Sequence, residues 1–185
     1  VVVGGPHWSA EAAADLARFA EAQGLPVAVA FRRQDYFDNR HPNYAGDFNV
    51  APNPRLAQRL RDADGLLLLG TRMGDINTVG YSLLDPQGTD KRIFHVHADA
   101  AEAGHLWQPE LAVTATAPAF AAALARLNAA RGWSDWTRAA RADYDAWVAP
   151  VESPGAVKLE QVVRWLSDHL PADSYVTNGA GNYAA

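Results

Sequence analysis

Short, almost entirely apolar segments recur along this chain and constrain its fold more than any other feature. They cover residues 1–3, 26–31, 65–69, 93–96 and 111–115. A strand with one face in water alternates polar and apolar residues, whereas a strand buried on both faces is apolar throughout, as in parallel sheets. These segments are therefore predicted to be the strands of a parallel sheet, with the long polar stretch 32–53 as a connection.

Amphipathic helices are predicted between these strands. The first runs from an N-cap at Ser9 to Gly24, with Glu11, Asp15 and Arg18 on its exposed face. Further helices are predicted to begin at Asn53–Pro54 and at Pro118, where Phe120, Leu124 and Leu127 share one side, and to cover residues 133–149 and 157–170.

Alternation of buried strands with amphipathic helices requires parallel pairing through crossover connections. The predicted fold class is α/β, an open, doubly wound parallel sheet of the Rossmann-like, three-layer sandwich type with a DHS-like NAD/FAD-binding arrangement. We expect this domain to span residues 1–150. Residues 151–156 have linker composition, and residues 157–185, with a strand at 174–177, are expected to begin another domain.

Charge and composition exclude several classes of partner. The formal net charge is −5 at pH 7 with acids and bases interspersed, so we expect no nucleic acid partner. There is no cysteine for a disulfide framework. The longest purely apolar run, residues 66–69, is far below the roughly 20 residues of a membrane span. No targeting leader is recognisable, and we expect a cytoplasmic protein without a membrane partner.

The loops that follow the strands are the candidate binding region, because ligands of open α/β sheets bind beyond the carboxyl ends of the strands. These loops begin at Gly4, Arg32, Gly70, His97 and Asn178, and we expect them along one edge. Gly4 and Gly5 precede a helix whose first amides could hold an anion. The full Gly-x-Gly-x-x-Gly spacing is absent, which favours a tight turn instead.

Charged residues near the strand ends have both a binding and a structural interpretation. Arg32, Arg33 and Arg72 could each pair with a phosphate or carboxylate ligand, or be neutralised by Asp35, Asp38 and Asp75 on the surface. His95 and His97 face the same side of a strand, as two metal ligands would. A third ligand is not evident, which favours ordinary strand histidines, and we predict no metal site.

The sequence contains no set of residues for nucleophilic catalysis. There is no cysteine and no Gly-x-Ser-x-Gly turn. Asp62 and Asp64 flank a junction between helix and strand, where capping and solvation explain them. We therefore predict no catalytic residue in this chain.

Five segments taken in order resemble the middle domain of thiamine-diphosphate-dependent enzymes of the acetolactate synthase and benzoylformate decarboxylase type. The segments are VVVGGPHWS, GLPVAVAFRRQDYFDN, HPNYAGDF, DADGLLLLGTRMGD and IFHVHAD. Residues 157–185 resemble the start of the third, diphosphate-binding domain of that family. The resemblance implies a parent enzyme that uses thiamine diphosphate and Mg²⁺ on a 2-keto acid or similar carbonyl, as a synthase or a decarboxylase.

The same resemblance implies an incomplete cofactor site in this chain. Gly181 and Asn182 fall in the loop that approaches the diphosphate, whereas the family's cofactor glutamate and metal motif have no counterpart here. We therefore expect a structural and oligomerisation domain that is inactive and binds no cofactor by itself. Its expected partners are the remaining domains of the same enzyme and further copies of it.

Some members of that family place FAD or ADP across the middle domain, and Gly4, Gly5, Arg72 and Asp99 match positions of such nucleotide sites. Two departures count against FAD: GDFNVAPN replaces a Gly-Met-His-Gly type loop, and His97 replaces an aspartate. A nucleotide-binding (FAD, ADP or NAD) Rossmann module of another class is the alternative hypothesis. A third is an interaction module that docks through the helix at 157–170.

Overall fold

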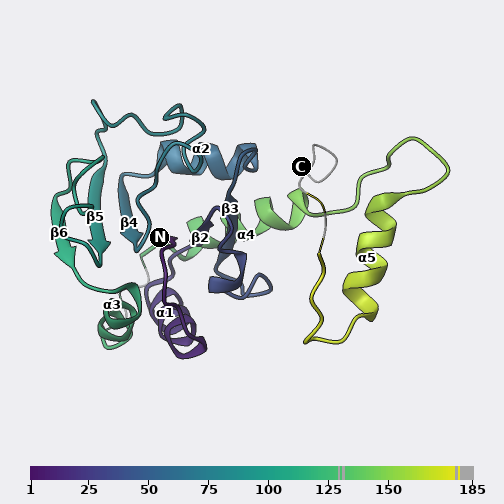
Figure 1. The fold of residues 1–185 in the computed structure, drawn as a ribbon, viewed down its shortest axis with the longest axis horizontal. Helices are drawn as coiled ribbons and strands as arrows, with labels where there is room; N and C mark the ends of the chain where they lie inside the picture. Colours follow the sequence, from purple (N-terminus) through teal and green to yellow (C-terminus); the bar gives the residue numbers. More distant parts are fainter. Residues whose placement is uncertain (129, 131, 178, 180–185) are drawn as a thin grey trace. The chain divides into compact units, whose positions relative to one another are not determined.

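Six parallel strands form one sheet in the order β3-β2-β1-β4-β5-β6, which confirms the predicted fold class (Figure 1). The computed structural model describes residues 1–128, 130, 132–177 and 179. The strands are β1 (Val2–Val3), β2 (Val27–Ala30), β3 (Tyr44–Phe48), β4 (Gly65–Leu69), β5 (Arg92–His97) and β6 (Leu111–Thr114). The order reverses at β1, so the chain winds to one side of the sheet and then to the other.

Two hydrophobic clusters cover the two faces of the sheet. Helices α1 (Ala10–Gln23) and α3 (Ala117–Leu124) pack on one face through residues such as Leu16 and Ala121, with Val3 beneath them. Leu56 and Leu60 of helix α2 (Pro54–Asp62) and Ala140 of helix α4 (Ser134–Trp147) cover the other face, against Val2. The alternation of Val2 and Val3 between the clusters follows from the period of two in a strand.

Helix α1 has the predicted ends. The Ser9 hydroxyl accepts a hydrogen bond from the Ala12 amide at 3.2 Å, and Gly24 ends the helix with a φ of 70°. The predicted exposed face is wrong at one position, because Asp15 is only 8% exposed and forms an ion pair with Arg18. That pairing allows a carboxylate to lie at the edge of the core.

Strand β3 lies inside the stretch that the sequence predicts as a polar connection. Val27 pairs with Tyr44 and Ala28 with Gly46, so Ala45 is an extra residue that forms a β-bulge. Gly46 adopts a φ of 115°, which a glycine accepts readily. The bulge breaks the alternation of the strand, and the short 3-10 helix η1 (Gln34–Tyr36) precedes it.

The predicted apolar side of the helix after Pro118 is also wrong in part. Ala117 and Ala121 of helix α3 are buried in the cluster that contains Leu16 of α1, and Phe120 and Leu124 are partly buried and pack against the same cluster, as predicted. Leu127 lies beyond the end of the helix and is 54% exposed. The prediction is therefore wrong only at Leu127, because the helix ends at Leu124 before it reaches that residue.

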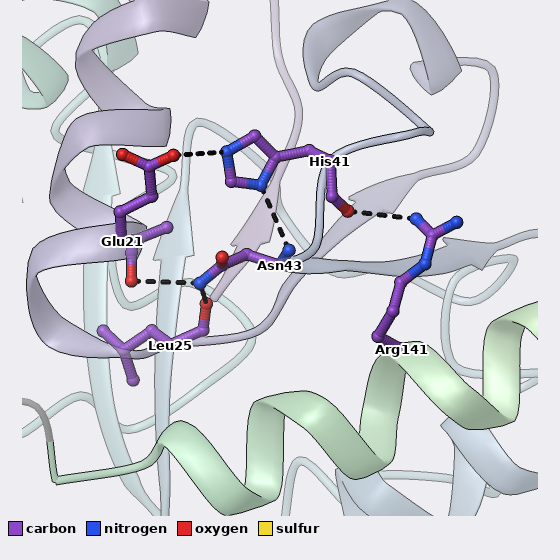
Figure 2. Close-up of polar contacts among 6 residues, drawn as sticks. Glu21, Leu25, His41, Asn43 and Arg141 are labelled. Carbon is purple, nitrogen blue, oxygen red and sulfur yellow. Dashed lines mark hydrogen bonds and ion pairs between the residues drawn. The ribbon is translucent and has the colours of Figure 1, made fainter.

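A buried amide fixes the loop before β3 to helix α1. The side chain of Asn43 donates to the carbonyl oxygens of Ala20 at 3.1 Å and Leu25 at 2.8 Å. Figure 2 shows Asn43 between His41, whose ring contacts Glu21, and the carbonyl of Leu25. In the same view, Arg141 of α4 donates to the carbonyl of His41 at 3.0 Å.

The chain divides into the units Val1–Asp145 and Ala146–Ala185. In the second unit, helix α5 (Leu159–His169) has no buried residue, and Val163 and Trp165 are 58% and 57% exposed. Residues 174–177 form neither a helix nor a strand, which contradicts the predicted strand. An extended segment becomes a strand only when it pairs with another. Among the described residues, no helix is long and apolar enough to cross a membrane.

Candidate functional site

A cleft of about 790 Å³ lies at the carboxyl edge of the sheet, where loops from four strands meet. Its wall includes Gly5 after β1, Arg33 after β2, Arg72 after β4 and Asp99 after β5. The structure thus brings the predicted loops together at one edge, apart from the one at Asn178, which lies outside the described residues. A cleft of this size falls within the range of small-molecule sites.

The loops after β1 and β4 contact each other through their backbones. The Gly4 amide donates to the Leu69 carbonyl at 3.0 Å, so Gly4 extends the ladder. Gly5 and Gly70 have φ values of 80° and 74°. A Cβ on Gly70 would lie 2.5 Å from the Gly4 oxygen and 2.9 Å from the Ala117 Cβ. Gly4 and Gly5 therefore form a tight turn, whose close contact with Gly70 leaves no room for a larger residue at position 70.

Arg72 lies on the cleft wall and pairs with Glu102, not with the predicted Asp75. Its Nη1 atom lies 3.3 Å from Glu102 Oε1, and the two side chains are 65% and 27% exposed. The Trp107 indole donates to the Arg72 carbonyl at 2.9 Å and holds the backbone at this point. Asp75 instead closes a turn, because its carbonyl accepts from the Gly80 amide at 2.7 Å.

His95 and His97 both make local hydrogen bonds. His95 is 1% exposed; its Nε2 atom lies 3.0 Å from the Thr71 carbonyl, and its Nδ1 accepts from the Gly104 amide at 3.3 Å. Burial lowers the pKa of His95 below its usual value, which keeps the ring neutral. His97 Nδ1 accepts from the Asp99 amide at 3.1 Å. Both ring nitrogens of His95 thus have protein partners.

The cleft carries charges of both signs. Its lining includes two arginines, Arg33 and Arg72, and three carboxylates, Asp75, Asp99 and Glu102. Such a wall can orient a polar ligand by hydrogen bonds. Sequence reasoning missed Glu102, although its position three residues after Asp99 in a short turn places it at the same edge.

Two predicted cofactor residues, Gly181 and Asn182, lie outside the described residues. The other four predicted residues lie in the loops at the carboxyl edge of the sheet. Gly5, Arg72 and Asp99 line the cleft, whereas Gly4 lies in the ladder next to it.

Comparison with known proteins shows which family this chain belongs to. The family described as "Thiamine pyrophosphate enzyme, central domain" matches residues 1–124, which include all six strands and the cleft. The chain belongs to this family. The match confirms the resemblance and favours the thiamine-enzyme hypothesis over a nucleotide-binding module of another class.

Curated relatives in this thiamine pyrophosphate enzyme family differ in activity. A sulfoacetaldehyde acetyltransferase of Alcaligenes xylosoxydans xylosoxydans is 30% identical over 77% of this chain and 24% of its own length. An acetolactate synthase large subunit of Corynebacterium glutamicum is 26% identical over 98% of this chain and 30% of its own length. The chain thus spans about a quarter to a third of these relatives.

A solved structure has the same fold as this central domain. It is a thiamine diphosphate-dependent 4-hydroxybenzoylformate decarboxylase of Rhodococcus jostii RHA1, with a TM-score of 0.50 and 24% identity. The alignment covers 71% of this chain and 25% of that chain.

Proposed function

We propose that this chain serves as the central structural and oligomerisation domain of an enzyme that uses thiamine diphosphate and Mg²⁺. The reaction would be that of an acetolactate synthase-like transferase or of a decarboxylase, with a 2-keto acid as substrate. The family match over residues 1–124 is the observation that supports this proposal. Residues 1–150 would be the central domain, 151–156 a linker and 157–185 the start of the diphosphate-binding domain.

The cofactor would be held largely outside the described residues. Gly181 and Asn182 would approach the diphosphate, and other domains of the enzyme would supply the remaining contacts. Among the described residues, no group of three or more His, Cys, Asp or Glu side chains is placed to hold a metal ion. We assign no step of thiamine chemistry to these residues, and we expect the 185-residue chain to be inactive by itself.

The proposed partners are the remaining domains of the enzyme and further copies of the chain, in the cytoplasm. Support for association comes from helix α5, on which Val163 and Trp165 are exposed. Exposed apolar surface of this kind favours contact with another protein surface. Light scattering over a range of concentrations would show an increase in mass if the proposal is correct and a constant monomer if it is wrong.

The activity proposal is tested by comparing two proteins. One is the 185-residue chain, and the other is the longer protein encoded by the complete reading frame around it. Both are assayed for conversion of 2-keto acids with thiamine diphosphate and Mg²⁺. We expect turnover only by the longer protein. Turnover by the 185-residue chain, or a longer protein without thiamine-dependent activity, would contradict the proposal.

Adenine-nucleotide binding is a second candidate function of the same edge. It is favoured by one observation, that Gly5, Arg72 and Asp99 line a single cleft. A phosphate would have to compete with Glu102 for the Arg72 guanidinium, which weakens binding. Calorimetry with ADP and FAD tests this function. A dissociation constant below about 100 μM, or about −5.5 kcal/mol, would support it, and absence of heat would exclude it.

A further inference from the structure

The turn that follows β5, residues 98–106, contributes to one wall of the cleft. All of its residues are exposed or half-buried. Trp107, directly after the turn, is 0% exposed, and its indole donates to the Arg72 carbonyl at 2.9 Å. Segments with little buried surface open more easily than the core that carries them. The turn can therefore move while Trp107 and the backbone of Arg72 stay in place.

A hydrogen bond fixes the turn to the buried ring of His95. The Gly104 amide donates to the Nδ1 atom of His95 at 3.3 Å. The Nε2 atom lies 3.0 Å from the Thr71 carbonyl, and because a carbonyl oxygen only accepts, Nε2 carries the hydrogen of the neutral ring. Protonation adds a hydrogen to Nδ1, so that two donors face each other. The hydrogen bond to Thr71 survives this change, whereas the hydrogen bond to Gly104 does not.

Charged and titratable groups line the cleft beside this contact. They are Arg72 and Asp75 on the loop after β4, His97 on β5, and Asp99, Glu102 and His105 on the turn. Burial lowers the pKa of His95 and the His97 ring lowers it further, whereas the hydrogen bond to Thr71 and the Glu102 carboxylate act to raise it. The net effect is a lowered pKa. A hydrated imidazole takes up a proton at a pKa near 6.5, so acid favours an open turn.

We infer that protonation of His95 opens the turn after β5 and uncovers an oxyanion-binding site at Arg72. In the closed turn, Glu102 Oε1 lies 3.3 Å from Arg72 Nη1. Glu102 moves away with the turn, whereas Trp107 holds the Arg72 backbone. A guanidinium without its carboxylate partner binds the oxygens of a sulfate or phosphate group through paired hydrogen bonds. The inference goes beyond the proposed function and does not depend on thiamine diphosphate.

Hydrogen exchange at the Gly104 amide tests whether the turn opens by itself. Its protection factor, corrected for intrinsic exchange, should fall about tenfold from pH 7.5 to 5.5, the linkage expected when the ring takes up a proton only in the open turn. Exchange should not depend on urea up to about 1 M, because local opening exposes little surface. Gly70, whose amide donates to the Val96 carbonyl inside the sheet, is the control. Equal protection and equal urea dependence at Gly104 and Gly70 would overturn the inference.

Sulfate binding tests the uncovered site, because sulfate keeps its charge over this pH range. Binding is followed by NMR at the Arg72 amide, at constant ionic strength. Between pH 7.5 and 5.5 the dissociation constant should fall about tenfold more in the unaltered chain than in His95→Gln, since only the open turn binds. Any fall that remains in His95→Gln comes from His97 and His105. An equal fall in both proteins, or no sulfate binding to the unaltered chain at either pH, would contradict the inference.

Discussion

The imidazole of His95 lies 3.0 Å from the carbonyl oxygen of Thr71 and joins strand β5 to the loop that follows β4. The opposite ring nitrogen accepts from the Gly104 amide, so a neutral ring satisfies two backbone groups, the Thr71 carbonyl and the Gly104 amide. A proton on the second nitrogen would remove its ability to accept. This arrangement makes the carboxyl edge of the sheet dependent on the protonation of one buried side chain.

We predict that acid destabilises the chain through His95. Burial lowers the pKa of His95 in the folded protein, whereas the unfolded chain takes up a proton near the usual pKa of 6.5. The unfolded state therefore binds more protons below pH 6.5, and the free energy of unfolding falls as the pH decreases towards the folded pKa. Urea unfolding at pH 7.5 and 5.5 measures the loss. It should be smaller in His95→Gln, and an equal loss in both proteins would contradict the prediction.

Because the backbones of Gly4 and Gly70 are in close contact, we predict that a methyl group added at position 70 lowers the free energy of unfolding strongly. In Gly70→Ala the new Cβ would overlap the Gly4 oxygen and the Ala117 side chain at a positive φ, with a cost of at least about 2 kcal/mol. Gly74→Ala is the matched control, because nothing lies within 4 Å of its Cβ position. It should change the free energy of unfolding by less than about 0.5 kcal/mol. Similar effects of the two substitutions would argue against this contact.

The ion pair between α2 and α4 should stabilise the fold more than exposed pairs do. Arg59 Nε and Nη2 lie 2.8 and 2.5 Å from Asp143 Oδ2, and both side chains are less than a fifth exposed. Asp143→Asn should lower the free energy of unfolding by about 1–3 kcal/mol. Asp135→Asn, which breaks an exposed pair with Arg138, should lower it by less than about 1 kcal/mol. Denaturant titration distinguishes these values.

Asn43 should tolerate loss of its side chain better than a change of its amide to a carboxylate. Its Nδ2 group donates to Ala20 and Leu25, so Asn43→Ala leaves two carbonyls without that donor, at a cost of about 1–3 kcal/mol. In Asn43→Asp an ionised oxygen would face the same two carbonyls, and the loss at pH 7 should be greater. Denaturant titration should show that lowering the pH to 4 recovers part of the stability of Asn43→Asp relative to Asn43→Ala. A pH-independent difference would contradict this account.

Sequence patterns predicted the elements whose signals are local. Strand β4 has the bounds predicted from its continuous run of leucines, and helix α1 begins after Ser9 and ends at Gly24 as expected. Strand β3 was missed because its bulge at Ala45 and its glycine interrupt the pattern on which strand prediction depends. The burial of Asp15 was missed because it depends on tertiary packing.

In the candidate site, too, the sequence predicted which loops meet but not which side chains pair across them. Fold topology correctly placed Gly5, Arg72 and Asp99 at one edge, since loops after parallel strands meet there. The partner of Arg72 was predicted among its neighbours in sequence, whereas the structure pairs it with Glu102, thirty positions away. Pairing across two loops depends on how each loop turns, which sequence spacing does not specify.

Thiamine diphosphate binding to the 185-residue chain tests most directly the claim that this central domain lacks a complete cofactor site. Thermal unfolding is measured with Mg²⁺, with and without thiamine diphosphate at about 100 times the dissociation constant of the longer enzyme. Binding to the native state would add about 2.7 kcal/mol and raise the melting temperature by about 5–10 °C. The account predicts a change of less than about 1 °C for the 185-residue chain, and a rise of 5 °C or more would contradict it.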